Sequence, residues 1–262
     1  MATPPRYRAI AKALRDEIIA GVLQPGAKLP PETRLVERFG VSRDTIRDAT
    51  KVLIQEGLVE RSGTGRGSGM VVRDRLMLVF HASYAEEPGA PRSEADSWAT
   101  DVRAQGLDPS QDFTCINVVL PDDVAMRLGE PEGAAGVLRR CVRYVNGHPS
   151  SIQDTYYPIW LADEVPELRQ PVDIVQGTTA LLAERGHIQV GYLDHTSARM
   201  PSPDETSLLR VGPGTPVLLK IRTGATRHRV VRVTIEIMVG DTNTVEYEIG
   251  DISAIRIEGE PA

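Results

Sequence analysis

The chain has few cysteines and no long apolar run, and these are the features that disulfide frameworks, cysteine metal sites and membrane spans require. Only two of its 262 residues are cysteines, Cys115 and Cys141, and their spacing fits no metal-ligand motif. We expect both to be reduced, buried and structural in a cytoplasmic protein. No apolar run approaches the roughly 20 residues that cross a bilayer, and the N-terminus lacks the apolar stretch of a signal peptide. The composition therefore predicts a globular protein with no membrane partner.

The motifs of common enzyme classes are also missing. The segment GTGRGSG at 63–69 fits neither the GxGxxG nor the GxxxxGK[ST] nucleotide-binding pattern. Ser68 is not in a GxSxG turn, because Arg66 occupies the first glycine position. The five histidines are scattered without an HExxH motif; they are His81, His148, His187, His195 and His228. We expect no catalytic residue, no cofactor and no metal site.

The overall acidity of the chain hides an uneven distribution of charge. The net charge is −6, with a sequence pI near 5.5. Residues 1–75 nevertheless hold 14 Lys and Arg against 9 Asp and Glu, a net charge of +5, and the remainder carries −11. A basic N-terminal part attracts phosphate groups, so the acidic pI does not exclude binding to nucleic acid.

Residues 41–61 carry the most informative pattern. At helical spacing they have an apolar face and a separate basic face. These faces hold Ile46, Ala49 and Leu53, and Arg43, Arg47 and Lys51. Ser42 stands at the expected N-cap and Gly57 at the expected stop. A helix with a packed back and a basic front fits a DNA major groove. The alternative is a surface helix whose basic residues pair with Asp44, Asp48 and Glu56.

The flanking segments favour the DNA-binding interpretation. Residues 7–21 predict a first helix, with Tyr7, Ile10, Leu14 and Ile18 on one face, and residues 29–40 predict a short second helix. A tight turn at Gly40 leads into the third helix, which makes a helix-turn-helix. The runs LVER and MVV then predict a hairpin, or wing, with Arg66 at its tip.

This arrangement resembles the winged-helix domain of the GntR family of bacterial transcription regulators. The resemblance rests on PGAKLP at 25–30, FGVSRDTIRDAT at 39–50, EGLVER at 56–61 and the wing at 63–69. In one departure, Pro31 and Thr33 replace the usual Ser and Arg around the Glu of helix two, so the usual cap is lost. The resemblance implies DNA contacts from Arg34, Ser42, Arg43, Thr45, Arg47, Lys51, Gly65, Arg66 and Gly67.

The rest of the chain predicts an α+β domain. Residues 73–100 are expected to be a linker that leads into it, and SWATDVRAQG a helix with Trp98 and Val102 inward. The strand-like runs that follow are FTCINVVL, GVLRRCVRYV, SSIQDTYY, VLLKIRT, VVRVTIEIMV and VEYEI. Asn146-Gly147 between two of them predicts a hairpin.

An internal repeat indicates pseudo-symmetry in this domain. Residues 121–143 parallel residues 203–222. Each copy begins a short helix at Pro-Asp, ends it near a glycine, turns and enters a strand. Two such copies predict one antiparallel sheet, although a helix followed by a strand is common enough for coincidence.

Residues 75–257 resemble the effector-binding UTRA domain of the HutC subfamily. The carrying features are LGEPEG, RYVNGHPSSIQDTYYP, LLAERG, ARMPSPDETSLLRVGPGTPVLLKIRT and MVGDTNTVEYEI. The resemblance implies a chorismate-lyase-like fold with a small-molecule pocket. Members that sense phosphorylated sugars have an Arg-x-Arg pair, of which only Arg143 remains here, with Cys141 at the first position.

Three further pocket positions depart from the pattern of those members. Gln153 and Arg232 replace glutamates, and Met238 replaces an aromatic residue. Arg232 favours a more anionic ligand, although strand arginines more often face solvent. With Arg143, these residues form the expected effector site. The alternative is that Arg143 only pairs with an acid such as Asp154.

The sequence thus predicts a winged helix-turn-helix at 1–72, a linker at 73–100 and a UTRA-like domain at 101–262. We expect a homodimeric repressor that binds an inverted-repeat DNA operator and a small effector. In the alternative, the C-terminal domain dimerises and binds no effector.

Overall fold

The computed structural model describes residues 5–62, 69–73, 78–81, 97–212 and 214–247. The chain forms two compact units. The first comprises Met1–Leu76 and Met200–Val217, and the second comprises Met77–Arg199 and Leu218–Ala262. No helix in the described ranges is long and apolar enough to cross a membrane.

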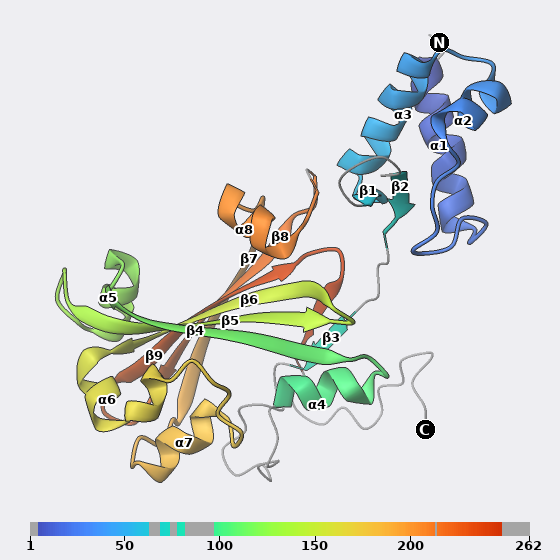
Figure 1. Ribbon diagram of the computed structural model, residues 1–262. Helices are drawn as coiled ribbons and strands as arrows, with labels where there is room; N and C mark the ends of the chain where they lie inside the picture. The colour runs from blue at the N-terminus through green and yellow to red at the C-terminus, as the bar shows by residue number, and fades with distance from the viewer. Residues whose placement is uncertain (1–4, 63–68, 74–77, 82–96, 213, 248–262) are drawn as a thin grey trace. The chain divides into compact units, whose positions relative to one another are not determined.

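Three helices build the N-terminal part of the first unit (Figure 1): α1 at Arg6–Ile19, α2 at Glu32–Phe39 and α3 at Arg43–Gln55. They share one core, because each carries apolar residues at helical spacing. Its buried members on the helices are Ile10, Ala11, Leu14, Leu35, Ile46, Ala49 and Leu53, and Tyr7, Ile18, Val36 and Phe39 pack against it. The predicted apolar faces of α1 and α3 are confirmed.

The helix ends follow the sequence signals. Ser42 Oγ accepts a hydrogen bond from the backbone N–H of Thr45 at 3.2 Å, which caps α3. Gly40 ends α2 with φ of 62°, and Gly57 follows α3 with φ of 64°, a backbone region that favours glycine. Pro31 precedes α2 and makes no side-chain cap, in agreement with the predicted loss.

A hairpin follows α3, as predicted. Strands β1 (Val59–Ser62) and β2 (Gly69–Val72) pair antiparallel, with Val59 opposite Val72. A helix-turn-helix followed by this hairpin is a winged helix. The proposed wing-tip contacts Gly65, Arg66 and Gly67 lie outside the described residues.

One antiparallel sheet of six strands organises the second unit (Figure 1), in the order β4-β5-β6-β9-β8-β7. The strands are β4 (Pro109–Val119), β5 (Ala135–Val145), β6 (His148–Pro158), β7 (Gly191–Arg199), β8 (Val217–Ala225) and β9 (Val230–Val239). Asn146 and Gly147 have positive φ values of 51° and 76° in the tight β5–β6 turn, so the predicted hairpin is confirmed.

The strand order confirms the predicted internal repeat. The first half runs β4-β5-β6 and the second runs β9-β8-β7, which is the same order reversed about the sheet centre. Helix α5 (Asp122–Leu128) precedes β5, and α8 (Pro203–Leu209) precedes β8. The left-handed residue that ends each helix is Gly129 in the first copy and Arg210, two residues before Gly212, in the second, so both helices end near a glycine as expected.

Strand β7 was absent from the sequence expectation. It is an edge strand, and most of its residues are exposed. The sequence GYLDHTSAR therefore lacks the apolar alternation of a half-buried strand.

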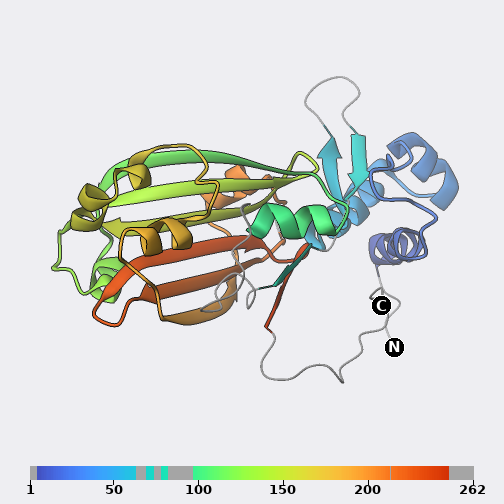
Figure 2. The same ribbon diagram turned by 90° about the horizontal axis from the view of Figure 1, so that it is seen from below.

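The two faces of the sheet differ in chemistry. One face packs against α5, where Leu120, Val124 and Leu128 meet Val233. The opposite face is covered by α4 (Ser97–Ala104), the 3₁₀ helix η1 (Pro166–Arg169) and α7 (Thr178–Glu184), with α6 (Ile159–Glu164) beside them. In Figure 2 these helices lie in front of the strands.

Helix α4 is fixed by the first strand of this unit. Trp98 and Val102 are buried, as predicted, and pack with Leu78 of β3 (Leu78–His81). Strand β3 pairs in parallel with β10 (Asn243–Glu246). The Gln105 side chain bonds both backbone groups of Val79, at 3.0 and 2.9 Å, which ties β3 to the end of α4.

Candidate functional site

The basic face of α3 is exposed, opposite the buried Ile46, Ala49 and Leu53. Arg43 has no ion pair among the described residues. Arg47 Nε lies 3.3 Å from Glu32 Oε1 and its Nη1 lies 3.6 Å from Asp44 Oδ1. The contact with Asp44 is one that the surface-helix alternative expects, and the contact with Glu32 of α2 is not.

The remaining contacts on α3 divide between the two interpretations. Lys51 Nζ lies 3.0 Å from Asp48 Oδ1, as that alternative expects. Glu56 instead bonds Arg15 of α1, with Nε to Oε2 at 2.9 Å. The Arg47 and Lys51 side chains remain 56% and 69% exposed. Exposed pairs contribute only about 0–1 kcal/mol, so they do not prevent these cations from contacting a polyanion.

Two further expected DNA contacts lie at the start of α3. Ser42 Oγ and Thr45 Oγ1 are 2.8 Å apart, and Ser42 is exposed. Arg34 is exposed on α2. The structure therefore brings Ser42, Arg43 and Thr45 to one helix start.

The covered face of the sheet forms a polar layer. Alternate residues of a strand point to the same face, so the register of β4, β5, β6 and β9 defines this layer. We use the name for the polar and charged residues Gln111, Cys115, Arg139, Cys141, Arg143, Ser151, Gln153, Thr155, Asp194, Lys220, Arg222, Arg232, Thr234 and Glu236.

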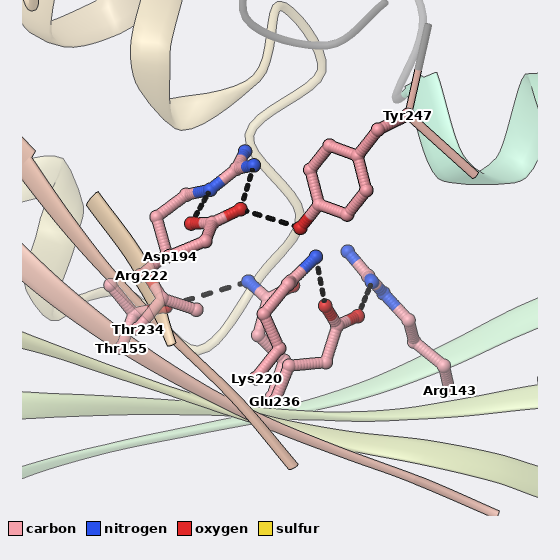
Figure 3. Close-up of polar contacts among 9 residues, drawn as sticks. Arg143, Thr155, Asp194, Lys220, Arg222, Thr234, Glu236 and Tyr247 are labelled. Carbon is pink, nitrogen blue, oxygen red and sulfur yellow. Dashed lines mark hydrogen bonds and ion pairs between the residues drawn. The ribbon is translucent and has the colours of Figure 1, made fainter. Parts of the chain in front are cut away.

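An ion-pair network of three residues lies at the centre of the polar layer (Figure 3). Glu236 Oε1 is 2.8 Å from Arg143 Nη1, and its Oε2 is 2.9 Å from Lys220 Nζ. All three residues are buried. Arg143 also lies over the Trp98 ring, and Lys220 lies over the Phe80 ring, at 5.0 and 4.2 Å from the centroids.

The alternative prediction that Arg143 pairs with Asp154 was wrong. Asp154 is on the other face of β6, because it neighbours Gln153 and Thr155 in the strand. It pairs with Arg140 there, at 2.7 and 2.6 Å. Arg143 is therefore paired, but with a residue from the opposite half of the sheet.

The cations of the polar layer set the ionisation of its carboxyl groups. Burial alone would raise the pKa of Glu236, but Lys220 and Arg143 outweigh burial and hold that pKa below its usual range. Burial opposes ionisation of Asp194 too. Bidentate bonding by Arg222, at 2.7 and 2.6 Å, lowers the pKa of Asp194, and Tyr247 donates a further hydrogen bond at 2.8 Å (Figure 3). Both residues are carboxylates near neutral pH.

The four residues expected in an effector site share this face. Gln153 stands between Cys141 and Glu236 in the register, and Met238 stands opposite Ser151. Arg232 is buried rather than solvent-facing, and its Nη2 donates to Thr179 Oγ1 at 3.2 Å. Arg143 and Arg232 are on separate strands, β5 and β9, within one layer.

A cavity of about 870 Å³ opens beside the β4 end of the polar layer. Gln111 and Phe113 of the layer's face line it, with Ala99 and Arg103 of α4 and residues 171–173 and 175. Arg139 lies next to this cavity, stacks on the Phe113 ring and bonds the carbonyls of Gln170 and Val172. The volume is in the range of small-molecule sites.

Sequence reasoning missed Lys220, Arg222, Asp194 and Glu236. Part of this set could have been predicted from the strand-like runs VLLKIRT and VVRVTIEIMV. Polar residues alternate there with apolar ones, at Lys220 and Arg222 and again at Arg232, Thr234 and Glu236. A period of two places each set on one face.

The cysteines differ from expectation in one respect. Both are free thiols, and Cys141 is buried and donates to Gln111 Oε1 at 3.1 Å. Cys115 is only partly buried, on edge strand β4. Within the described residues, no cluster of His, Cys, Asp and Glu is able to hold a metal ion.

Comparison with known proteins agrees with both halves of this description. Residues 6–72 match the bacterial regulatory proteins of the gntR family, and residues 104–243 match the UTRA domain. The HTH-type transcriptional repressor NagR of Bacillus subtilis is 27% identical over 84% of this chain and 84% of its own length. The mannosyl-D-glycerate transport/metabolism system repressor MngR of Escherichia coli K12 is 25% identical, over 86% and 87%.

Solved structures show the same fold. The crystal structure of PhnF from Mycobacterium smegmatis aligns with a TM-score of 0.56 and 23% identity, over 92% of this chain and 99% of that one. The winged helix and the six-stranded sheet define a DNA-binding regulator with an effector domain. The chain belongs to the GntR family, in its HutC subfamily with a UTRA domain. Its relatives are transcriptional regulators, GntR regulators bind DNA operators, and UTRA domains bind small-molecule effectors.

Proposed function

We propose that this chain is a homodimeric repressor, active in the cytoplasm, whose release from an inverted-repeat operator is controlled by a small molecule. DNA binding is assigned to residues 1–72 and effector binding to residues 101–262. The observation that carries the proposal is the polar layer. A domain that served only to dimerise has no need to bury five cations on one sheet face, because buried charge is costly.

The DNA contacts are assigned to the start and the basic face of α3, with the wing beside it. Arg43 and Arg47 are long, exposed and close to the helix start, where side chains reach base edges. Ser42, Thr45, Lys51 and Arg34 are assigned to phosphate or base contacts, and Gly65, Arg66 and Gly67 to the minor groove.

Two copies are needed because one small winged helix offers few base contacts. A twofold dimer then requires an operator with twofold symmetry. Two named relatives, NagR and MngR, are repressors, which supports the sign of regulation. What these relatives bind is not transferred to this chain, because Gln153, Arg232 and Met238 replace residues of the sugar-sensing pattern.

Selection of bound duplexes from a randomised pool, using the full-length chain, tests the DNA-binding half. We expect an enriched inverted repeat, and light scattering of the complex should show two chains per duplex. Enrichment of a single half-site by a monomer would contradict the dimer. The effector half is tested by thermal shift with a metabolite panel, since a ligand of the native state raises the melting temperature. If no compound in a broad panel binds, the domain that only dimerises is favoured.

A further inference from the structure

We propose that Gln189 and Arg232 form an oxyanion subsite at the β8–β9 end of the polar layer. The subsite selects a small anion that carries a hydroxyl or amino hydrogen-bond donor next to its anionic group. The inference rests on the proposed effector function and gives it a ligand class.

The side-chain amide of Gln189 is the first observation. Gln189 is 6% exposed, and neither its Oε1 nor its Nε2 has a hydrogen-bond partner in the described structure. Buried amides are nearly always satisfied, since an unmet donor or acceptor costs about 1–3 kcal/mol. One side chain with both atoms unmet therefore marks a place that a polar ligand completes.

The space around this amide is defined by Gly224. A Cβ at Gly224 would lie 2.5 Å from Gln189 Oε1 and 3.3 Å from Arg232 Nε. The absence of a side chain at 224 lets the amide reach down to the sheet beside the guanidinium. Gly224 alternates with Lys220 and Arg222 along β8, so it opens onto the same polar layer.

Hydroxyl groups and an aromatic ring complete the walls. Arg232 Nη2 donates to Thr179 Oγ1 at 3.2 Å, and Arg232 also bonds the fully buried Tyr157. The Arg232 guanidinium carbon is 5.9 Å from the centroid of the Tyr192 ring. These groups are neutral hydrogen-bonding or stacking partners, and they hold the guanidinium in place beside Gln189.

The charge of the layer determines the sign of the ligand. Its described residues include five cations, Arg139, Arg143, Lys220, Arg222 and Arg232, and two carboxylates, Asp194 and Glu236. Both carboxylates are bonded to cations other than Arg232 in the contacts given above. An anion that enters at Arg232 therefore reduces the excess positive charge.

The amide determines the second requirement. Its Nε2 is a donor for an oxyanion, and its Oε1 is an acceptor that an oxyanion alone cannot satisfy. A hydroxyl or amine beside the anionic group satisfies that acceptor. A carboxylate with a neighbouring hydroxyl meets both requirements, and so does a phosphate that retains a P–OH.

Two matched anion pairs test the inference with the full-length protein. Near neutral pH phosphate has a P–OH donor and sulfate has none, and glycolate differs from acetate by one hydroxyl. Calorimetry at constant ionic strength should show phosphate binding about tenfold tighter than sulfate, the effect of one hydrogen bond between charged and neutral partners. Glycolate should exceed acetate in the same way.

Gln189→Met is the decisive variant, because it keeps the length of the side chain and removes both polar atoms. It should erase both preferences and leave the melting temperature of the ligand-free protein equal to or above that of wild type. A structural glutamine would lower the melting temperature. Gln55→Met, the same change at an exposed position in the other unit, is the matched control and should retain both preferences.

Arg232→Gln should weaken the binding of all four anions. Arg232→Lys should retain part of the affinity, because it keeps the positive charge. The inference is overturned if wild type binds none of the anions above the level of matched chloride. It is also overturned if the phosphate preference persists in Gln189→Met. Operator selection on the same preparations separates this failure from failure of the proposed function, because DNA binding does not depend on the subsite being correct.

Discussion

Glu236 and Arg143 are separated by 93 positions in sequence, yet Glu236 Oε1 lies 2.8 Å from Arg143 Nη1 in the middle of the sheet. The pair joins β9 to β5, one strand from each half of the repeat. Because both side chains are buried, the Glu236 carboxylate depends on Arg143 and Lys220 to offset the cost of burying its charge.

We therefore expect Arg143→Ala to destabilise the second unit by about 3 kcal/mol, because it leaves a buried carboxylate with Lys220 alone. Urea unfolding followed by circular dichroism measures the loss. The triple variant Arg143→Met, Lys220→Met, Glu236→Met should recover much of it, since it removes all three buried charges and leaves none of them without its partner. A triple variant no more stable than Arg143→Ala would show that the ion-pair network is not the cause.

The layer should make the protein sensitive to acid. The pKa values of Glu236 and Asp194 are lower in the folded chain than in the unfolded chain, where carboxyl groups titrate near about 4. Their contribution to stability is complete above the unfolded pKa and is lost as pH falls through the folded pKa. Melting temperatures measured downward from about pH 5 should fall steeply in wild type. The variant Glu236→Gln, Asp194→Asn should show a shallower fall, and an identical slope would contradict this assignment.

Arg47→Ala should weaken operator binding by about 1–3 kcal/mol while the helical unit stays folded. Its ion pairs with Glu32 and Asp44 are exposed, so their loss has little effect on stability. Fluorescence anisotropy on the selected operator measures the change. Lys12→Ala is the control, because Lys12 is an exposed base on α1 with its own Asp16 pair. Equal effects of the two variants would indicate attraction by net charge alone.

Ser42→Ala should lower the stability of the winged helix by about 1 kcal/mol, since it removes the N-cap of α3. Ser42→Asp restores a cap and adds a favourable charge at the helix start, so it should recover the stability. The same aspartate faces phosphate if α3 binds DNA, and operator affinity should then remain low. Recovery of both stability and affinity by Ser42→Asp would remove Ser42 from the DNA-binding set.

The sequence predicted the winged helix well because its signals are local. Apolar spacing, the Ser42 cap and the glycines at 40 and 57 act within a few residues of each other. The hairpin at Asn146-Gly147 and the repeat were predictable for the same reason. Strand β7 was not, because its stability comes from pairing with β8 at the sheet edge rather than from its own pattern.

The polar layer was harder to predict, because its contacts join residues that are far apart in the sequence. Arg143 and Arg232 were predicted as site residues from a resemblance, but the partner of Arg143 depended on which strands are neighbours. Asp154, close in sequence, points to the wrong face, and Glu236 becomes adjacent only when β9 pairs with β6. The Gln189 amide without hydrogen-bond partners could not be predicted from the sequence, because the partners of a buried group depend on how the whole domain packs.

The reversed strand order places β6 of the first half beside β9 of the second, so charged residues of the two halves meet at the centre of the sheet. The described layer residues of β4, β5 and β6 include Arg139 and Arg143 and no carboxylate, and Glu236 comes from the other half. The second half supplies its own pairs, Lys220 with Glu236 and Arg222 with Asp194. The first half takes its counter-charge from the second, so a substitution at Glu236 constrains what position 143 tolerates.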